Sequence, residues 1–158
     1  MPARPLILIV SLIYSGVLVA QSAPPAQNIS GWQMQDVAKV QAAAPVLSTT
    51  RFVPQGWYAA TVPGTVLTTL VNNRVYPEPL YGENMRAIPE SLNRTSYWYR
   101  TVLAIPSSYK GRHTWLHFEG INYSAQIWVN GHQAGGMRGA FIRGDFDVPG
   151  PSSCRRLH

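Results

Sequence analysis

Apolar and polar residues alternate along several short stretches of this chain, which is the pattern of half-buried β-strands. Leu116 and Phe118 fall on one face of such a strand. Trp115 and His117 fall on the opposite face. Other stretches combine the same alternation with aromatic and β-branched residues, which are typical of strands. The predicted strands comprise residues 97–105, 114–118, 124–130 and 141–148.

Turn and cap signals divide these strands. Asn130-Gly131 predicts a tight hairpin, because both residues tolerate the positive φ that such a turn requires. Thr65 is suited to cap a short helix over residues 66–71, in which apolar positions recur at helical spacing. Asn72-Asn73 ends that helix. Short strands joined by turns indicate an antiparallel β-sandwich or jelly roll.

Composition supports an all-β domain with a packed core. The chain has 158 residues, of which 46% are hydrophobic, and it contains 13 Gly, 13 Pro, five Trp and eight Tyr. Frequent turn residues together with many aromatic residues suit a loop-rich β fold better than a helical bundle. One ordinary domain fits this length.

The first residues have the pattern of a secretory leader. Arg4 precedes an apolar stretch over residues 6–20, and small residues follow it. We therefore expect residues 1–23 to be a signal peptide, with an uncleaved membrane anchor as the alternative. Either alternative exports the domain, so we expect a secreted or periplasmic protein with no membrane attachment once the leader is cleaved.

The rest of the chain divides into three parts. We expect residues 24–51 to be a linker and leading segment with one possible strand, and residues 52–148 to be the folded domain. Residues 149–158 read as an aberrant tail, as a frameshift or premature stop would leave, so we expect the domain to be incomplete at its C-terminus. The single cysteine, Cys154, allows no intrachain disulfide and has no visible partner for catalysis.

The positive charge does not indicate nucleic-acid binding. The formal charge is +6, but Arg4 lies in the leader, and Arg155 and Arg156 lie in the tail. The other basic residues are scattered singly, without a run that could follow a phosphate backbone. We therefore expect no nucleic-acid partner.

The acidic residues offer one closely spaced pair. Asp145 and Asp147 point to the same face of a strand, and we expect them to be exposed to solvent. A general acid/base pair and a calcium site are the alternatives. We expect Glu119 to pair with Arg100 or to hydrogen-bond a turn, with contact to a sugar hydroxyl as the alternative.

Motifs for metals and cofactors are not recognisable. His113, His117 and His132 lack the spacing of a metal site, and His117 is expected to pack beside its strand neighbours. The glycines of residues 135–139 suit a flexible loop better than a phosphate-binding loop. We expect neither a metal nor a cofactor.

A set of motifs follows a fixed order along the chain. It comprises WY at 57–58, TVPGTV at 61–66, YWYRT at 97–101, LHFEGINY at 116–123, IWVNGH at 127–132, GAF at 139–141 and FDV at 146–148. In this order the motifs resemble the N-terminal sugar-binding domain of glycoside hydrolase family 2. The resemblance is strongest to exo-β-D-glucosaminidases and β-mannosidase-like enzymes, and it covers roughly residues 29–148.

This resemblance implies a galactose-binding-like jelly roll that leads a multidomain exo-glycosidase. In that family an immunoglobulin-like domain and a (β/α)₈ barrel with two catalytic glutamates follow. We therefore expect no catalytic residues in this chain, no hydrolysis by the chain alone, and the downstream domains as its partners. The carbohydrate implied is a β-linked glucosaminide or mannoside.

Sugar recognition combines flat aromatic rings with planar polar groups. Two predicted loops carry such residues: Tyr81, Glu83, Asn84 and Arg86 in one, and Asn122 and Tyr123 in the other. We expect Asn84 and Arg86 to reach the rim of the barrel's pocket, or else only to anchor the interface between domains.

The tryptophans within strands are expected to pack in the core or at an interface rather than to contact sugar. These are Trp98, Trp115 and Trp128. Two other functions remain open at this level: a stand-alone carbohydrate-binding module, or a structural domain that binds another protein.

Overall fold

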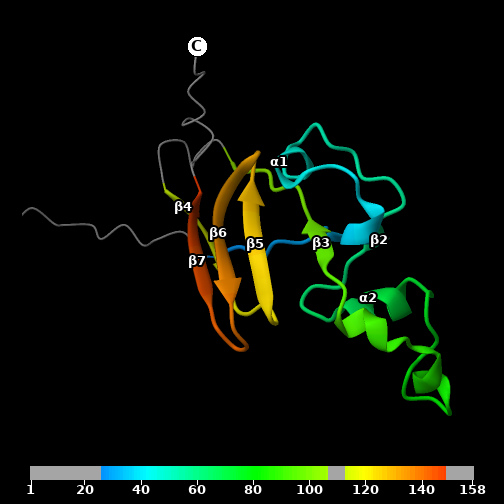
Figure 1. Cartoon of the computed structure of the whole chain (residues 1–158). Coiled ribbons are helices and arrows are strands. Elements are labelled where there is room, and N and C mark those ends of the chain that lie inside the picture. The colour runs from blue at the N-terminus through cyan, green and yellow to red at the C-terminus, as the bar shows by residue number, and fades with distance from the viewer. Residues whose placement is uncertain (1–25, 107–112, 149–158) are drawn as a thin grey trace, which may run out of the picture.

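The computed structural model describes residues 26–106 and 113–148. Strands dominate this part of the chain, and short helices lie mainly in its first half (Figure 1). The strands are β1 (Gln33–Asp36), β2 (Tyr58–Ala59), β3 (Tyr97–Arg100), β4 (Thr114–Phe118), β5 (Ser124–Val129), β6 (His132–Arg138) and β7 (Gly144–Val148). The α-helices are α1 (Ala44–Leu47) and α2 (Val66–Asn72), and the 3₁₀ helices are η1 (Val37–Lys39), η2 (Asn84–Ala87) and η3 (Glu90–Asn93).

The first sheet has three antiparallel strands, with β1 between β2 and β3. Met34 of β1 pairs with Tyr58 and Tyr99 and is fully buried. The domain therefore begins earlier than the expected boundary at Phe52, and the leading segment supplies the central strand of a sheet. The four residues of β1 mix apolar and polar side chains without a clear period, so their pattern alone does not predict a central strand.

The predicted helix is confirmed as α2. The backbone N–H of Thr68 donates to Thr65 Oγ1 at 3.0 Å, which satisfies an otherwise free donor of the first turn. Leu70 is buried on the face of α2 that meets the sheet. The predicted strand over residues 97–105 is shorter than expected, since its ladder ends at Arg100.

The remaining strands form two antiparallel pairs, β4–β7 and β5–β6. In the first pair, Trp115 lies opposite Asp147 and His117 lies opposite Asp145. The second pair is the expected hairpin, in which Asn130 and Gly131 have φ values of 48° and 90°.

Strand β6 corrects the expected flexible loop. Position 135 of this strand requires a glycine, because the ring of Phe146 in β7 occupies the space that a side chain would need. A Cβ at this position would lie 2.5 Å from that ring. Phe146 also packs edge-to-face on Phe118 of β4. The two strand pairs therefore pack against each other, and β6 and β7 lie side by side in Figure 1.

Backbone contacts join the hairpin to the first half of the domain. Ser48, which follows α1, accepts hydrogen bonds from Asn130 N at its carbonyl oxygen and from Gly131 N at its hydroxyl. Leu47 of α1 and Ile127 of β5 are both buried. The architecture is the β-rich fold that the strand pattern predicts.

Some expectations fall outside the described residues. These are the leader over residues 1–23, the tail over residues 149–158 and Cys154. Within residues 26–106 and 113–148, the helices are all too short or too polar to cross a bilayer.

Candidate functional site

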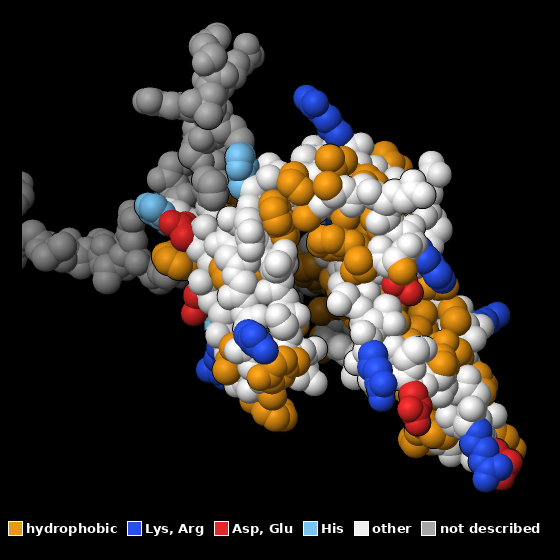
Figure 2. Space-filling model, viewed as in Figure 1, with side chains coloured by type: hydrophobic (Ala, Val, Ile, Leu, Met, Phe, Trp, Pro, Cys, Tyr) orange, Lys and Arg blue, Asp and Glu red, His pale blue; other side chains and the backbone are white. Residues whose placement is uncertain are grey.

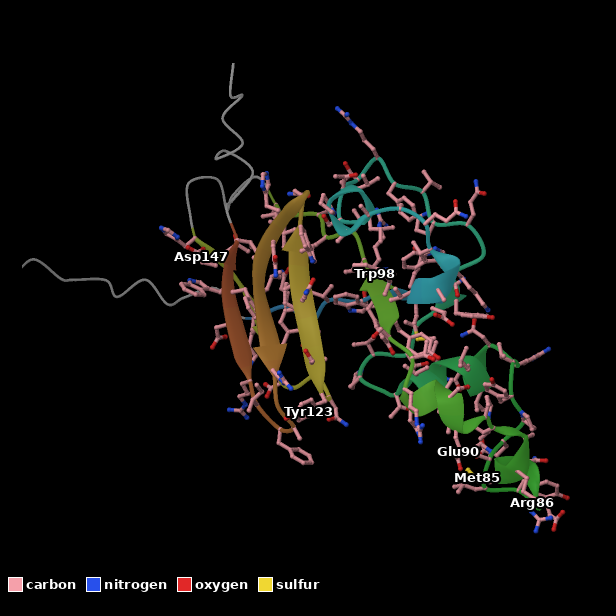
Figure 3. All side chains as sticks on the ribbon, viewed as in Figure 1. Met85, Arg86, Glu90, Trp98, Tyr123 and Asp147 are labelled. Carbon is pink, nitrogen blue, oxygen red and sulfur yellow. The ribbon has the colours of Figure 1, made fainter. Side chains whose placement is uncertain are left out.

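The first group of candidate residues lies on a segment that projects away from the strands (Figures 1 and 3). Arg86 Nη1 and Glu83 Oε2 form an exposed ion pair at 3.0 Å. The side-chain amide of Asn84 donates to the carbonyl oxygen of Glu78 at 2.9 Å, which fixes that side chain against its own loop. Tyr81 is 78% exposed, so its ring is available to a partner.

Apolar side chains are exposed on the same projection. Leu80 is 87% exposed, and Met85, labelled in Figure 3, is also exposed. Leu92 of η3, by contrast, is only half-buried, so the projection has little core of its own. Exposed apolar residues beside polar ones mark a surface that meets another molecule or domain.

Asn122 and Tyr123 lie elsewhere. Tyr123 is at one end of the strands in Figure 3, well separated from Arg86. The backbone N–H of Gly139 donates to the carbonyl oxygen of Tyr123 at 2.7 Å, and this bond holds the loop against the start of the next turn. The six candidates therefore form two separate groups, so they do not line a single site.

The structure also shows a third polar surface, whose residues the sequence analysis did not group together. It is the outward side of the β4–β7 pair, which we call the β4–β7 outer face. Alternate residues of the two strands and their ends share this side, because strand side chains alternate and the ladder sets them opposite one another. The β4–β7 outer face comprises His113, Trp115, His117, Glu119, Arg143, Asp145 and Asp147.

Each aspartate of this face is paired with a histidine across the ladder. His117 Nδ1 lies 2.5 Å from Asp145 Oδ1, and His113 Nδ1 lies 3.1 Å from Asp147 Oδ2. The expectation that both aspartates share one exposed face is confirmed. The expectation that His117 packs beside its strand neighbours is wrong, because its ring is about half exposed and faces carboxylates.

Glu119 extends the same network. It lies 3.4 Å from His117 Nε2 and 3.0 Å from Arg143 Nε. The expected pairing with Arg100 is wrong, since Arg100 donates instead to backbone carbonyl oxygens in the first half of the domain. Arg100 ends β3 and Glu119 follows β4, and these two strands belong to different sheets, which the sequence alone did not reveal.

The pKa of His117 is raised above its ordinary value. The main cause is the hydrogen bond to Asp145, and the charges of Asp145 and Glu119 add to it, while partial burial opposes it. The imidazolium form is therefore favoured on this face. No group of three or more His, Cys, Asp or Glu residues in the described part of the chain is placed to hold a metal ion.

Trp115 lies in the middle of the β4–β7 outer face and is 61% exposed. Trp98 and Trp128 are half-buried, as expected for packing residues. Trp115 is the exception, because its strand has the core on its other side, under Leu116 and Phe118. The alternation of residues 114–118 already contained this signal.

A shallow cavity of about 230 Å³ lies in the first half of the domain. Its lining residues come from two segments, 39–42 and 52–57. Phe52 and Trp57 meet edge-to-face there, and the guanidinium of Arg100 lies over the ring of Phe52. The pocket is smaller than the usual site for a small molecule, so it is a minor feature.

The model of one protein family matches most of the chain. It is described as glycosyl hydrolase 2 galactose-binding domain-like, and it covers residues 32–153. The match includes every strand described above.

Curated relatives agree with this match. An exo-β-D-glucosaminidase from Streptomyces avermitilis is 30% identical over 133 residues, which are 82% of this chain and 14% of the relative. A mannosylglycoprotein endo-β-mannosidase from Lilium longiflorum is 34% identical over 75% of this chain and 13% of the relative. The chain thus spans about one seventh of the length of these relatives.

Solved structures give the same result. The exo-chitosanase CsxA of Amycolatopsis orientalis matches with a TM-score of 0.71 and 31% identity, over 78% of this chain and 15% of that one. A complex of a variant of that enzyme with PNP-β-D-glucosamine matches with a TM-score of 0.68.

Proposed function

Because the chain belongs to the glycosyl hydrolase 2 galactose-binding domain-like family, we propose that it is the N-terminal sugar-binding domain of an exported β-glycosidase and that it is not catalytic by itself. The substrate class is a β-linked glucosaminide or mannoside, as the names of its relatives suggest. The observation that carries the proposal is the match of nearly the whole described chain to about one seventh of those enzymes.

The arrangement of carboxylates supports a non-catalytic role. Retaining hydrolysis requires two carboxyl groups about 5–5.5 Å apart on either side of the scissile bond. Asp145 and Asp147 lie on an open strand face and are each hydrogen-bonded to a histidine. Glu83 is paired with Arg86 on an exposed projection. These carboxylates are therefore not placed as a pair on either side of a scissile bond.

The projecting segment is the part that we assign to the rim of the downstream pocket. Asn84 and Arg86 supply an amide and a guanidinium there, both of which bind sugar hydroxyl groups well. Exposed Leu80, Tyr81 and Met85 beside them supply the apolar area that packs against a neighbouring domain. Asn122 and Tyr123, at a separate place, contribute to the interface between domains instead.

Export is the remaining part of the proposal. It depends on the basic and apolar pattern of residues 1–23, which is typical of a signal peptide. A secreted or periplasmic enzyme that acts on polymeric sugars outside the cell is consistent with this leader.

A domain replacement in the Amycolatopsis orientalis enzyme tests the proposal. The segment of that enzyme matched by this chain is replaced by residues 32–148, and hydrolysis of PNP-β-D-glucosamine is measured. We expect the chimera to be active. We also expect N84A and R86A within it to raise KM about tenfold with little change in kcat, because each removes binding at the rim.

The control for these variants is E90Q, which removes a charge from the same projection (Figure 3) and leaves KM unchanged. A soluble, correctly folded chimera without activity would contradict the assignment of the domain. An active chimera in which N84A and R86A leave KM unchanged would restrict both residues to the interface between domains.

A further inference from the structure

Two strands of the domain each have one edge that pairs with no other strand within residues 26–106 and 113–148. In this part of the chain β3 pairs only with β1, and β5 pairs only with β6. In Figure 1 the unpaired edges of β3 and β5 face each other, because β2 lies beyond β3 and β6 lies on the other side of β5. An unpaired edge presents a row of backbone N–H and C=O groups that are ready to pair with another strand.

The end of α1 holds the C-terminal ends of both strands. Arg100, the last residue of β3, donates from Nε to the carbonyl oxygen of Leu47 at 3.0 Å. The backbone N–H of Asn130, which follows β5, donates to the carbonyl oxygen of Ser48 at 3.1 Å. Because Leu47 and Ser48 are consecutive residues, β3 and β5 end close together. The two strands also run in the same direction, since both arrows point toward α1 in Figure 1.

The surface between these strands is hollowed and contains apolar side chains. Figure 2, which has the same view as Figure 1, shows orange side chains at the bottom of a hollow beside β5. Ile127 of β5 is buried, and Trp98 of β3 is half-buried. Trp128 of β5 has a buried indole nitrogen that finds no hydrogen-bond partner in the described part of the chain. Since buried N–H groups are normally paired, this donor lacks an acceptor that a neighbouring segment would supply.

We propose that the hollow between β3 and β5, which we call the β3–β5 gap, binds one extended polypeptide segment as an added strand that runs antiparallel to both. A single segment can pair in this way on both of its edges because β3 and β5 run in the same direction. Its main-chain hydrogen bonds supply the affinity, and its side chains supply the specificity. The segment carries apolar residues at alternate positions, because one of its faces covers the core and the other meets solvent.

The geometry selects a strand over other occupants. A strand is the partner whose donors and acceptors repeat at the spacing of the two edges. A folded second copy of this domain offers, among its described residues, only strands that already have a partner on one edge. Such a copy could pair with β3 or with β5, but it could not fill the gap between them.

The relatives contain polypeptide that is able to supply the added strand. The matched part is only about one seventh of the length of the curated relatives. In an enzyme of that kind, a strand in the β3–β5 gap would join this domain to the remainder of the protein. The inference depends on the two strand edges alone, so it holds whether or not the projecting segment contacts sugar.

The binding of a synthetic peptide to the purified chain tests this inference. The peptide comprises the roughly 25 residues that follow the matched segment in the Amycolatopsis orientalis exo-chitosanase, which is long enough for a connection and one strand. Its Kd is measured by the fluorescence anisotropy of a label on the peptide. We expect it to bind at least about tenfold more tightly than a peptide with the same residues in scrambled order. A third peptide with proline at two alternate strand positions lacks two backbone donors, and it should also lose at least about tenfold in affinity.

Hydrogen exchange of the backbone amides identifies where the peptide binds. Saturating peptide should slow exchange at least about tenfold for the amides of β3 and β5 that point into the gap, because these amides become paired. Strand β4 is the matched control, since it also pairs with a single strand in the described part of the chain. It lies beyond β7 and β6 from the gap in Figure 1, so its amides should show no comparable slowing.

Three results would overturn the inference: no binding of the peptide, equal affinity for the scrambled peptide, or slower exchange in β4 without slower exchange in β3 and β5. A chain that forms a stable dimer in analytical ultracentrifugation and binds no peptide would assign these edges to a second copy instead. The chimera experiment is separate, because it tests the projecting segment through KM. An active chimera together with an isolated chain that binds no peptide would leave the proposed function standing and remove the β3–β5 gap as a binding site.

Discussion

Arg100 is the residue that fastens the first half of the domain. Its Nε donates to the carbonyl oxygen of Leu47, and its Nη2 donates to those of Thr49 and Phe52, each at 3.0 Å. The guanidinium also lies over the Phe52 ring. Because a planar fork reaches several acceptors at once, one half-buried side chain closes a loop that begins some fifty residues earlier in the chain.

Replacing Arg100 should therefore destabilise the domain. R100A leaves three carbonyl groups without this donor, and we expect a loss of about 2–3 kcal/mol in the free energy of unfolding, measured by urea denaturation. R100K should recover only part of the loss, because an ammonium cannot reproduce the fork. R94A, which removes an exposed arginine, should change stability by less than about 0.5 kcal/mol. Equal stability of R100A and R94A would refute the role of Arg100.

His117 makes part of the stability depend on pH. Since its folded-state pKa is raised, its pair with Asp145 contributes fully below the unfolded pKa of about 6.5 and is lost as pH rises through the folded value. The difference in stability between the unmodified chain and H117Q should therefore be largest below about pH 6.5 and should shrink as the pH rises above that value. H132Q is the control, and a difference that grows with pH would contradict the expected direction.

At the level of residues, the sequence indicated which side chains share a strand face but not which side chains of other strands they contact. The alternation of residues 114–118 placed Trp115 and His117 together. Their partners Asp145 and Asp147 come from a strand about 30 residues later, and the register between the two strands is set by packing, which no local pattern encodes. The pairing of Glu119 was wrong for the same reason.

Among the elements, β6 depends on an unusual fit. Gly135 has no side chain, and the ring of Phe146 fills the space above it, so that two strands approach closely. Met137 of the same strand lies against Gly144 of β7 in the same way. Two glycines therefore determine how the hairpin meets the β4–β7 pair.

The fit predicts a strong effect of one added methyl group. G135A puts a Cβ 2.5 Å from the Phe146 ring, so we expect a loss of about 1–3 kcal/mol in the free energy of unfolding. G120A is the matched control, since its Cβ would meet only an ordinary contact at 3.8 Å. Thermal or urea unfolding of both variants measures the difference, and a G135A domain as stable as G120A would show that β6 and β7 are not packed in this way.

Local chemistry predicted some elements well and others not at all. Thr65 capping α2 and the turn at Asn130-Gly131 are decided within a few residues, and both are confirmed. Strand β6 was missed because its glycines look like a loop, and their purpose appears only when Phe146 is placed beside them. Strand β1 is only a possible strand by its sequence, because four residues carry no period, and the burial of Met34 depends on two distant strands.

The whole molecule combines a small core with much exposed apolar surface. Met34, Leu47, Leu70, Ile127, Met137 and Val148 are the buried apolar residues of the described part. Exposed apolar residues gather on the projecting segment, and orange side chains are visible there in Figure 2. Exposed apolar surface of this kind is suited to packing against another molecule or domain.

At this largest scale the sequence was most informative. The ordered motifs from residue 57 to residue 148 identified the family that the comparisons confirm, and the family implied the β-rich fold that is observed. What the motifs did not give was the division of the candidate residues into separate surfaces, because the distance between loops depends on how the strand pairs pack.

The central claim is that this chain binds sugar but does not cleave it. The most direct measurement is turnover of PNP-β-D-glucosamine and of the corresponding mannoside by the purified 158-residue chain. We predict no release of nitrophenol above the buffer blank. Release that follows the chain through purification and is abolished by D145N would contradict the claim, because a carboxylate of this domain would then act on the glycosidic bond.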